Sequence, residues 1–135
     1  MTGPHDVVDE RRAYAAKPLI GAFVLDTALV VVFTVIGRLS HDEHPLAGLW
    51  TTSWPFLLAL IVGWAISFAW RAPTAPVRTG LPVWAVTVAG GMLLRAADGQ
   101  GVQPAFVVVA SLVLLAFLVG WRLVAALAGR ARRTG

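Results

Sequence analysis

Four long apolar stretches, separated by short polar segments, dominate the pattern of residues along the chain. A helix needs about 20 mainly apolar residues to cross the hydrocarbon core of a bilayer, and the stretches approach or exceed that length. The third is the shortest, and we expect Arg95 at its end to reach outward to the membrane interface. The pattern predicts an all-α fold, an integral membrane bundle of four transmembrane helices. The expected helices cover residues 18–37, 49–70, 80–94 and 103–128.

Composition agrees with a membrane protein and excludes several kinds of site. Hydrophobic residues make up 58% of the 135 residues and charged residues 13%, whereas soluble domains are roughly half apolar and a quarter charged. The chain has no cysteine, which excludes disulfides, thiolate metal ligands and cysteine nucleophiles. Its length suits one domain with short tails and no separate catalytic domain.

The distribution of lysine and arginine predicts the orientation of the helices. Eight basic residues lie before the first stretch, between the second and third, or after the fourth, and only Arg38 and Arg95 flank the opposite side. Because basic residues concentrate on the cytoplasmic side, both termini should lie in the cytoplasm of a plasma-membrane protein. Residues 1–17 would then be a cytoplasmic tail, 18–128 the transmembrane domain and 129–135 a basic cytoplasmic tail. The eight basic residues are Arg11, Arg12, Lys17, Arg71, Arg78, Arg130, Arg132 and Arg133.

Two charged residues interrupt the apolar stretches and form a candidate intramembrane charge pair. Asp26 lies about 8 residues, or ~12 Å, from the cytoplasmic end of the first helix, and Arg122 about 6 residues, or ~9 Å, from that end of the fourth. A charge inside hydrocarbon is costly and should face the bundle interior, where the two residues can pair at similar depth. Two interpretations stay open. Asp26 is either bound structurally, by Arg122, threonines or tryptophan, or it is a proton- or ion-coupled site.

The polar segment GRLSHDEHP, between the first and second stretches, combines an arginine, two histidines and two acids. His41 and His44 are of a type that binds metals, but a zinc site needs three or four ligands and no further cluster is visible, so we expect no metal and no cofactor. Ser40 and His41 are adjacent, yet sequence neighbours rarely face each other and no Gly-x-Ser-x-Gly motif is present, so we expect no enzyme activity. A turn, with Arg38 reaching from the helix end to the interface, explains the segment most simply.

Short motifs spread along the chain resemble one family of membrane proteins. They are GRLSH after the first stretch, WPF at the start of the second, GW within it, TVAGGMLLR in the third and GWR near the end of the fourth. Together, over roughly residues 18–122, they resemble the small four-helix bacterial and archaeal membrane proteins of the domain of unknown function 3054 family. The family brings no assigned activity. The resemblance favours a candidate outer polar pocket formed by Arg38, His41, Trp54 and Arg95. The residues that it highlights are Asp26, Gly37, Arg38, His41, Trp54, Pro55, Phe56, Gly63, Trp64, Thr87, Gly91, Arg95, Gly120, Trp121 and Arg122.

Two classes of function follow from these features. The preferred one is a non-catalytic membrane module that binds a protein or lipid partner through its tryptophans, small residues and basic tail. The alternative is a small proton- or ion-coupled transporter, or a transporter subunit, that uses Asp26 with a mouth formed by Arg38 and Arg95. The lipid bilayer is the expected surrounding, a membrane-protein partner or a homo-oligomer is left open, and no nucleic-acid partner is expected. The small residues recur at intervals of four and are Ala59, Gly63, Ser67, Ala85, Ala89, Ala116 and Gly120.

Overall fold

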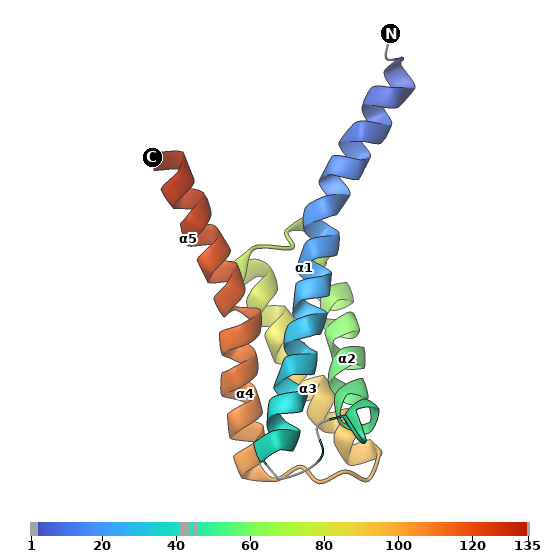
Figure 1. Ribbon diagram of the computed structural model, residues 1–135, viewed down its shortest axis with the longest axis vertical. Coiled ribbons are helices and arrows are strands. Elements are labelled where there is room, and N and C mark those ends of the chain that lie inside the picture. The colour runs from blue at the N-terminus through green and yellow to red at the C-terminus, as the bar shows by residue number, and fades with distance from the viewer. Residues whose placement is uncertain (1–2, 41–43, 45, 135) are drawn as a thin grey trace.

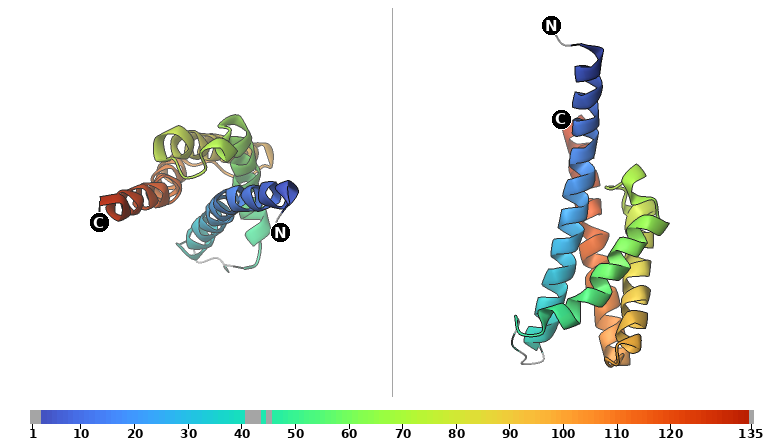
Figure 2. Two further views of the ribbon diagram at one scale, coloured as in Figure 1. Left: turned by 90° about the horizontal axis from the view of Figure 1, so that it is seen from above. Right: turned by 90° about the vertical axis from the view of Figure 1, so that its right-hand side faces the viewer.

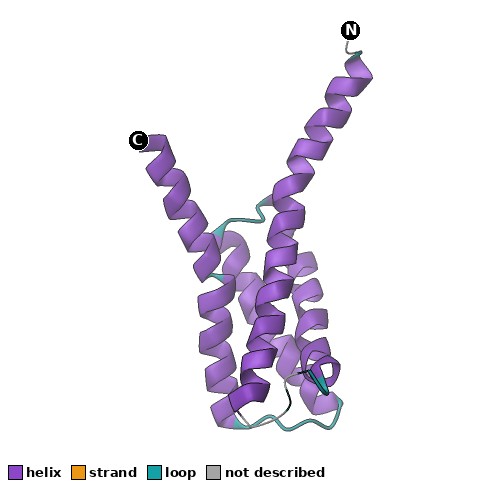
Figure 3. Ribbon diagram, in the orientation of Figure 1, coloured by secondary structure: helices purple, strands orange, loops and turns teal. Residues whose placement is uncertain are grey.

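The computed structural model describes residues 3–40, 44 and 46–134, without the side chains of 9–16, 40, 133 and 134. Within this part of the chain the structure consists of helices and contains no strand (Figure 3). A 3₁₀ turn, Ala69–Arg71, and a π-helical turn, Pro76–Gly80, lie between the second and third helices. The five α-helices are α1 (Pro4–Ser40), α2 (Leu49–Ile66), α3 (Leu81–Ala97), α4 (Pro104–Leu118) and α5 (Gly120–Thr134).

Four segments of the structure are long and apolar enough to cross a membrane, which confirms the prediction of an all-helical chain with four such helices. They overlap the four apolar stretches of the sequence. The third segment includes the π-helical turn before α3, and the fourth joins α4 to α5. The segments are Lys17–Leu39, Leu49–Ile66, Pro76–Ala97 and Pro104–Arg132.

The helices run alternately up and down, so both chain ends lie at the same end of the bundle (Figure 1). The connection from α2 to α3 lies at this end too. We call the opposite end, where α1 and α3 finish and α2 and α4 begin, the distal end. The first turns of α1 and the last turns of α5 extend beyond the other helices (Figure 2).

The first and fourth helices differ from the sequence-based prediction. Helix α1 begins at Pro4 and runs through Pro18, so most of the expected tail continues the helix. Asp6 stabilises this start, because its carboxylate accepts the backbone N–H of Gly3 at 2.9 Å. The fourth stretch forms two helices that meet at Val119 rather than one. Helix α5 leans away from α4 after this junction (Figure 1). Its first residue is Gly120, and glycine is a weak helix former.

Small residues bring α2 and α3 into close contact. A Cβ atom added to Gly91 would overlap the ring of Phe56, and one added to Gly90 would lie 3.0 Å from the side chain of Ala59. Gly63 packs in the same way against the backbone of Val83. Because lipid tails are as apolar as the helices, such close packing is a main source of helix association in a membrane.

The core holds an aromatic cluster near the distal end. The ring of Phe33 lies edge-on to that of Phe56, with centroids 5.3 Å apart, and Phe106 lies 6.2 Å from Phe56. These rings come from α1, α2 and α4. They therefore hold the three helices together beneath the distal end.

Candidate functional site

A salt bridge joins Asp26 in α1 to Arg122 in α5, and both side chains are fully buried, with 0% exposure. The contact is bidentate: Nη1 donates to Oδ1 at 2.9 Å and Nη2 donates to Oδ2 at 2.7 Å. This fork geometry is the strongest arrangement of a guanidinium with a carboxylate. The structure thus brings together the two charged residues that interrupt the apolar stretches.

Two tryptophans complete the surroundings of the carboxylate. The indole N–H of Trp64 donates to Oδ2 at 2.8 Å, and that of Trp121 donates to Oδ1 at 2.8 Å. Each carboxylate oxygen of Asp26 therefore accepts two hydrogen bonds. An ionised carboxylate has about four acceptor positions in all, so these four donors saturate it.

The guanidinium of Arg122 is also held by the backbone. Its Nε donates to the carbonyl of Pro73 at 2.9 Å, and Nη1 donates to the carbonyl of Leu118 at 2.7 Å. The guanidinium lies 4.6 Å from the ring of Trp121. Helices α1, α2 and α5 and the α2–α3 connection are therefore tied together through Asp26 and Arg122. We call these two residues with Trp64 and Trp121 the charge clamp.

The charge clamp suits a structural role better than ion transfer. A coupling site needs an acceptor that can exchange partners with water or a cation, whereas both oxygens of Asp26 are occupied by protein donors. Of the structural alternatives, the geometry combines the ion pair with tryptophan donors. The nearby hydroxyl of Thr27 donates instead to the carbonyl of Phe23, at 2.8 Å.

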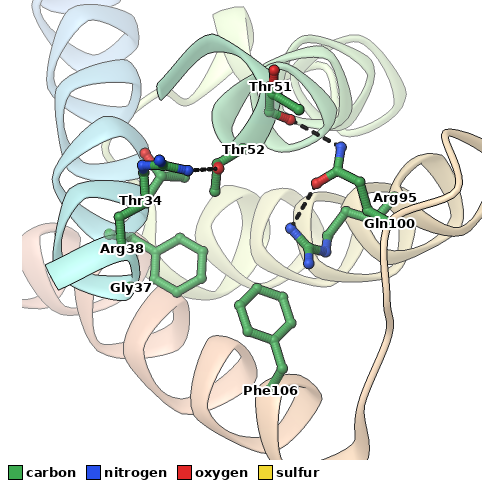
Figure 4. Close-up of a pocket in the computed structure, with 9 residues that line it drawn as sticks. Thr34, Gly37, Arg38, Thr51, Thr52, Arg95, Gln100 and Phe106 are labelled. Carbon is green, nitrogen blue, oxygen red and sulfur yellow. Dashed lines mark hydrogen bonds between the residues drawn. The ribbon is translucent and has the colours of Figure 1, made fainter. Parts of the chain in front are cut away.

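A pocket of about 280 Å³ lies at the distal end, and Arg38 and Arg95 both line it. Figure 4 shows Arg38 from α1 and Arg95 from α3 on opposite sides, with Thr52 and Gln100 between them. None of the described residues that line the pocket is acidic. We call it the distal pocket. Its lining consists of Phe33, Thr34, Gly37, Arg38, Thr51, Thr52, Arg95, Gln100 and Phe106.

Arg38 anchors the start of α2 and the residues before it. Its Nη1 donates to the hydroxyl of Thr52 at 2.9 Å, Nε donates to the carbonyl of His44 at 3.0 Å, and Nη2 donates to the carbonyl of Ala47. Gly48 adopts a positive φ of 75°, and a Cβ atom there would lie 3.2 Å from the guanidinium. Arg38 thus reaches from the helix end into the turn, and this contact fixes its guanidinium beside the pocket.

Arg95 is held by the α3–α4 connection. Its Nη1 donates to the side-chain oxygen of Gln100 at 3.0 Å, and Nη2 donates to the carbonyl of Gly101 at 3.0 Å. The guanidinium also lies 4.5 Å from the ring of Phe106. Gln100 in turn donates to the carbonyl of Thr51 at 2.9 Å, which connects this side of the pocket to α2. These hydrogen bonds hold the guanidinium at the edge of the distal pocket.

Trp54, another expected member of the outer polar pocket, lies outside the distal pocket. Trp54 donates from its indole N–H to the carboxylate of Asp98 at 3.3 Å and lines a separate apolar pocket with Trp50. His41 lies outside the described residues. His44 accepts the backbone N–H groups of Leu46 and Ala47 through Nδ1, at 3.2 and 3.1 Å, and so stabilises the turn. The structure brings together Arg38 and Arg95 from the expected set.

Sequence reasoning missed several residues of the distal pocket, chiefly Gln100 and Thr52. A single glutamine in a turn carries no recognisable pattern. A signal did exist on α1, where Asp26, Val30 and Thr34 are all buried and follow one another at intervals of four residues. Residues at that spacing share one helix face, and the next position on it is Arg38. The face therefore links the charge clamp to the distal pocket.

The fold and its two sites define a class of protein, an all-helical chain with four helices of membrane-spanning length and a buried charge pair between them. A family model described as "Protein of unknown function (DUF3054)" matches residues 23–125. The chain belongs to this family. The matched region contains both Asp26 and Arg122 and both arginines of the distal pocket. No curated protein matches the chain. No solved structure matches it.

Proposed function

We propose that the protein is a non-catalytic integral membrane module with both termini in the cytoplasm. Two features support this topology. The apolar segments are long enough to span a bilayer, and the chain ends lie at one end of the bundle together with the α2–α3 connection. Eight basic residues lie in the two chain ends and the α2–α3 connection, and this excess of positive charge favours a cytoplasmic location for that end of the bundle. The distal end then faces outward.

The module binds a partner that carries a negative charge, and its distal pocket is the binding site. The observation that carries this proposal is the convergence of Arg38 and Arg95 on one pocket from different helices. A guanidinium group recognises phosphate or carboxylate because it can donate two parallel N–H groups to either of them. The partner class is a lipid or protein with such a group.

Transport coupled to protons or cations receives less support. A transporter of that kind would use Asp26, whose oxygens already accept four hydrogen bonds from Arg122, Trp64 and Trp121. Asp26 lines neither the distal pocket nor the apolar pocket beside Trp50 and Trp54. The charge clamp instead stabilises the bundle that carries the distal pocket.

Binding of inorganic phosphate tests the proposed function. The protein in neutral detergent micelles should bind phosphate in isothermal titration calorimetry, and binding should weaken at higher ionic strength because exposed charges are screened. Arg38→Gln/Arg95→Gln should abolish binding. Arg78→Gln, which removes an exposed arginine from the other end of the bundle, is the matched control and should bind like the wild type. Equal phosphate binding by all three proteins, or none by the wild type, would contradict the proposal.

A further inference from the structure

Helix α5 is left uncovered by the other helices once it has passed the charge clamp. From Leu123 to Arg132 every residue is exposed except Gly129, which is half-buried. The exposed residues include the large apolar side chains of Leu123, Val124 and Leu127, at 47%, 67% and 62%. These turns lean away from α4 and lie apart from α1 (Figure 1), and the last of them extend beyond the α2–α3 connection (Figure 2).

The exposed surface of α5 changes from apolar to basic along the helix. Val124, Ala128 and Arg132 follow one another at intervals of four residues, so they share one face, with the positive charge at its end. Helix α5 contains arginines and no acidic residue. An apolar face that is joined to arginines is typical of helices that lie at a membrane interface.

The charge clamp fixes which face of α5 points outward. The side chain of Arg122 is fully buried, and its two Nη atoms donate to the carboxylate of Asp26 in α1. The face of α5 that carries Arg122, and Ala126 one turn later, therefore turns toward the bundle interior. Ala128 lies two residues after Ala126, which is nearly the opposite side of a helix, so it turns outward.

The length of the fourth membrane-spanning segment gives the depth of this outward face. The segment, Pro104–Arg132, has 29 residues, which span about 43 Å as a helix. A bilayer is about 40–45 Å thick with its headgroups and about 30 Å without them. Arg132 therefore reaches the phosphates of one leaflet. Val124, about 12 Å before it along the helix, reaches the acyl chains of the same leaflet.

We propose that the outward face of α5 binds an anionic lipid of the leaflet that surrounds this end of the bundle. The lipid phosphate contacts the guanidinium of Arg132, and an acyl chain lies along Ala128 and Val124. Arginine pairs well with phosphate because it donates two parallel N–H groups, and basic residues near a membrane surface attract anionic lipids. The site lies at the opposite end of the bundle from the distal pocket, so the lipid binds independently of the ligand of that pocket.

Charge favours a lipid over a second copy of the chain as the cover of α5. A dimer about an axis along the membrane normal would bring the arginines of two α5 helices to the same height. Like charges repel, and α5 has no acidic residue that compensates them. An anionic lipid supplies the opposite charge and the apolar chain together.

A fluorescent label on a single introduced cysteine reports the lipid beside α5, because the chain has no cysteine of its own. Ala128→Cys places the label on the outward face, one turn before Arg132. Ala126→Cys, the matched control, places it on the face that carries Arg122; both alanines are exposed. The labelled proteins are studied in vesicles of phosphatidylglycerol and phosphatidylcholine in equal parts, in which one lipid or the other carries bromine. Bromine quenches a label that it approaches, so the quenching ratio measures the local enrichment of phosphatidylglycerol.

We expect phosphatidylglycerol to be enriched at least about threefold beside the label at residue 128, and the label at residue 126 to be quenched less by both lipids. Arg132→Glu in the protein labelled at residue 128 should abolish the enrichment. Arg78→Glu is its matched control, because it changes the net charge of the same end equally, at an exposed arginine outside α5, and should keep the enrichment. Both positions are exposed, so both proteins should keep their helical circular dichroism.

Three results would overturn the inference. Equal quenching by the two lipids at residue 128 would mean that α5 does not select an anionic headgroup. Equal loss of enrichment in Arg132→Glu and Arg78→Glu would assign the effect to the net charge of this end instead of Arg132. Disulfide dimers of unlabelled Ala128→Cys, with little quenching at residue 128, would identify a second copy as the cover. Arg38→Gln/Arg95→Gln should keep the enrichment, which separates this lipid site from the distal pocket.

Discussion

Replacing Asp26 by asparagine tests how strongly the charge clamp holds the bundle. The amide keeps the shape of the carboxylate but removes its charge. In either orientation its NH₂ group faces two donors, one N–H of Arg122 and one tryptophan N–H. Removing one member of a buried ion pair costs about 3–5 kcal/mol, because the other charge is left uncompensated. We therefore expect Asp26→Asn to lower the free energy of unfolding by about 3–5 kcal/mol.

The double replacement Asp26→Leu/Arg122→Leu distinguishes pairing from two separate effects. It removes both charges, so the penalty of an uncompensated charge disappears. The indole N–H groups of Trp64 and Trp121 still lose their acceptor, and each unsatisfied buried group costs about 1–3 kcal/mol, so recovery should be partial. We expect the double variant to lose about 2–3 kcal/mol less than the sum of Asp26→Leu and Arg122→Leu.

Equilibrium unfolding in mixed detergent micelles, followed by the circular dichroism of the helices, provides the measurement. Tryptophan fluorescence is less suitable, because Trp64 and Trp121 contact the mutated groups directly. Two results would refute the reasoning: a loss below about 1 kcal/mol for Asp26→Asn, or strict additivity in the double variant. Either would mean that the buried pair does not stabilise the bundle in the way its geometry indicates.

Three further predictions concern packing and topology. Gly91→Ala should lower the free energy of unfolding by about 1–3 kcal/mol in the same assay, because its Cβ would meet the ring of Phe56; an unchanged value would show that α2 and α3 can separate freely. Thr87→Val should raise it by roughly 1 kcal/mol, since the buried Thr87 hydroxyl has no hydrogen-bond partner among the described residues; a loss would indicate an unseen partner. Reporter fusions at Gly99 should report an external location and those at Thr74 a cytoplasmic one; the reverse result would invert the topology.

The number and approximate extent of the helices that are long and apolar enough to span a membrane follow from the sequence, because the length of an apolar stretch is a strong physical signal. The residues at which these helices begin and end are predicted less well from the sequence. The first seventeen residues carry acids and bases and look like a tail, yet α1 begins at Pro4 and continues through them. The junction at Val119 also depends on local packing. The side chain of Arg122 turns inward there, and its guanidinium donates a hydrogen bond to the carbonyl of Leu118. Hydropathy does not register such a contact.

The two candidate sites differ in how far they could be predicted from the sequence. Matching depths brought Asp26 and Arg122 together as a hypothesis, since a charge inside an apolar stretch needs a partner at its own level. The part played by Trp121 could not be inferred, because tryptophans near a helix end are usually placed at the membrane interface and the rotation of α5 is not encoded in hydropathy. The position of Gln100 in the distal pocket could not be predicted for a related reason. Its contacts with Arg95 and α2 join segments far apart in sequence, which no local motif indicates.

Phosphate affinity tests at once whether the charge clamp is structural and whether the distal pocket is the binding site. The measurement compares the folded Asp26→Leu/Arg122→Leu protein with the Arg38→Gln/Arg95→Gln protein, at a temperature where both keep their helical circular dichroism. We predict that the first protein binds phosphate with an affinity within about twofold of the wild type and that the second does not bind it. Loss of binding in the folded clamp variant, with binding retained when Arg38 and Arg95 are replaced, would contradict it.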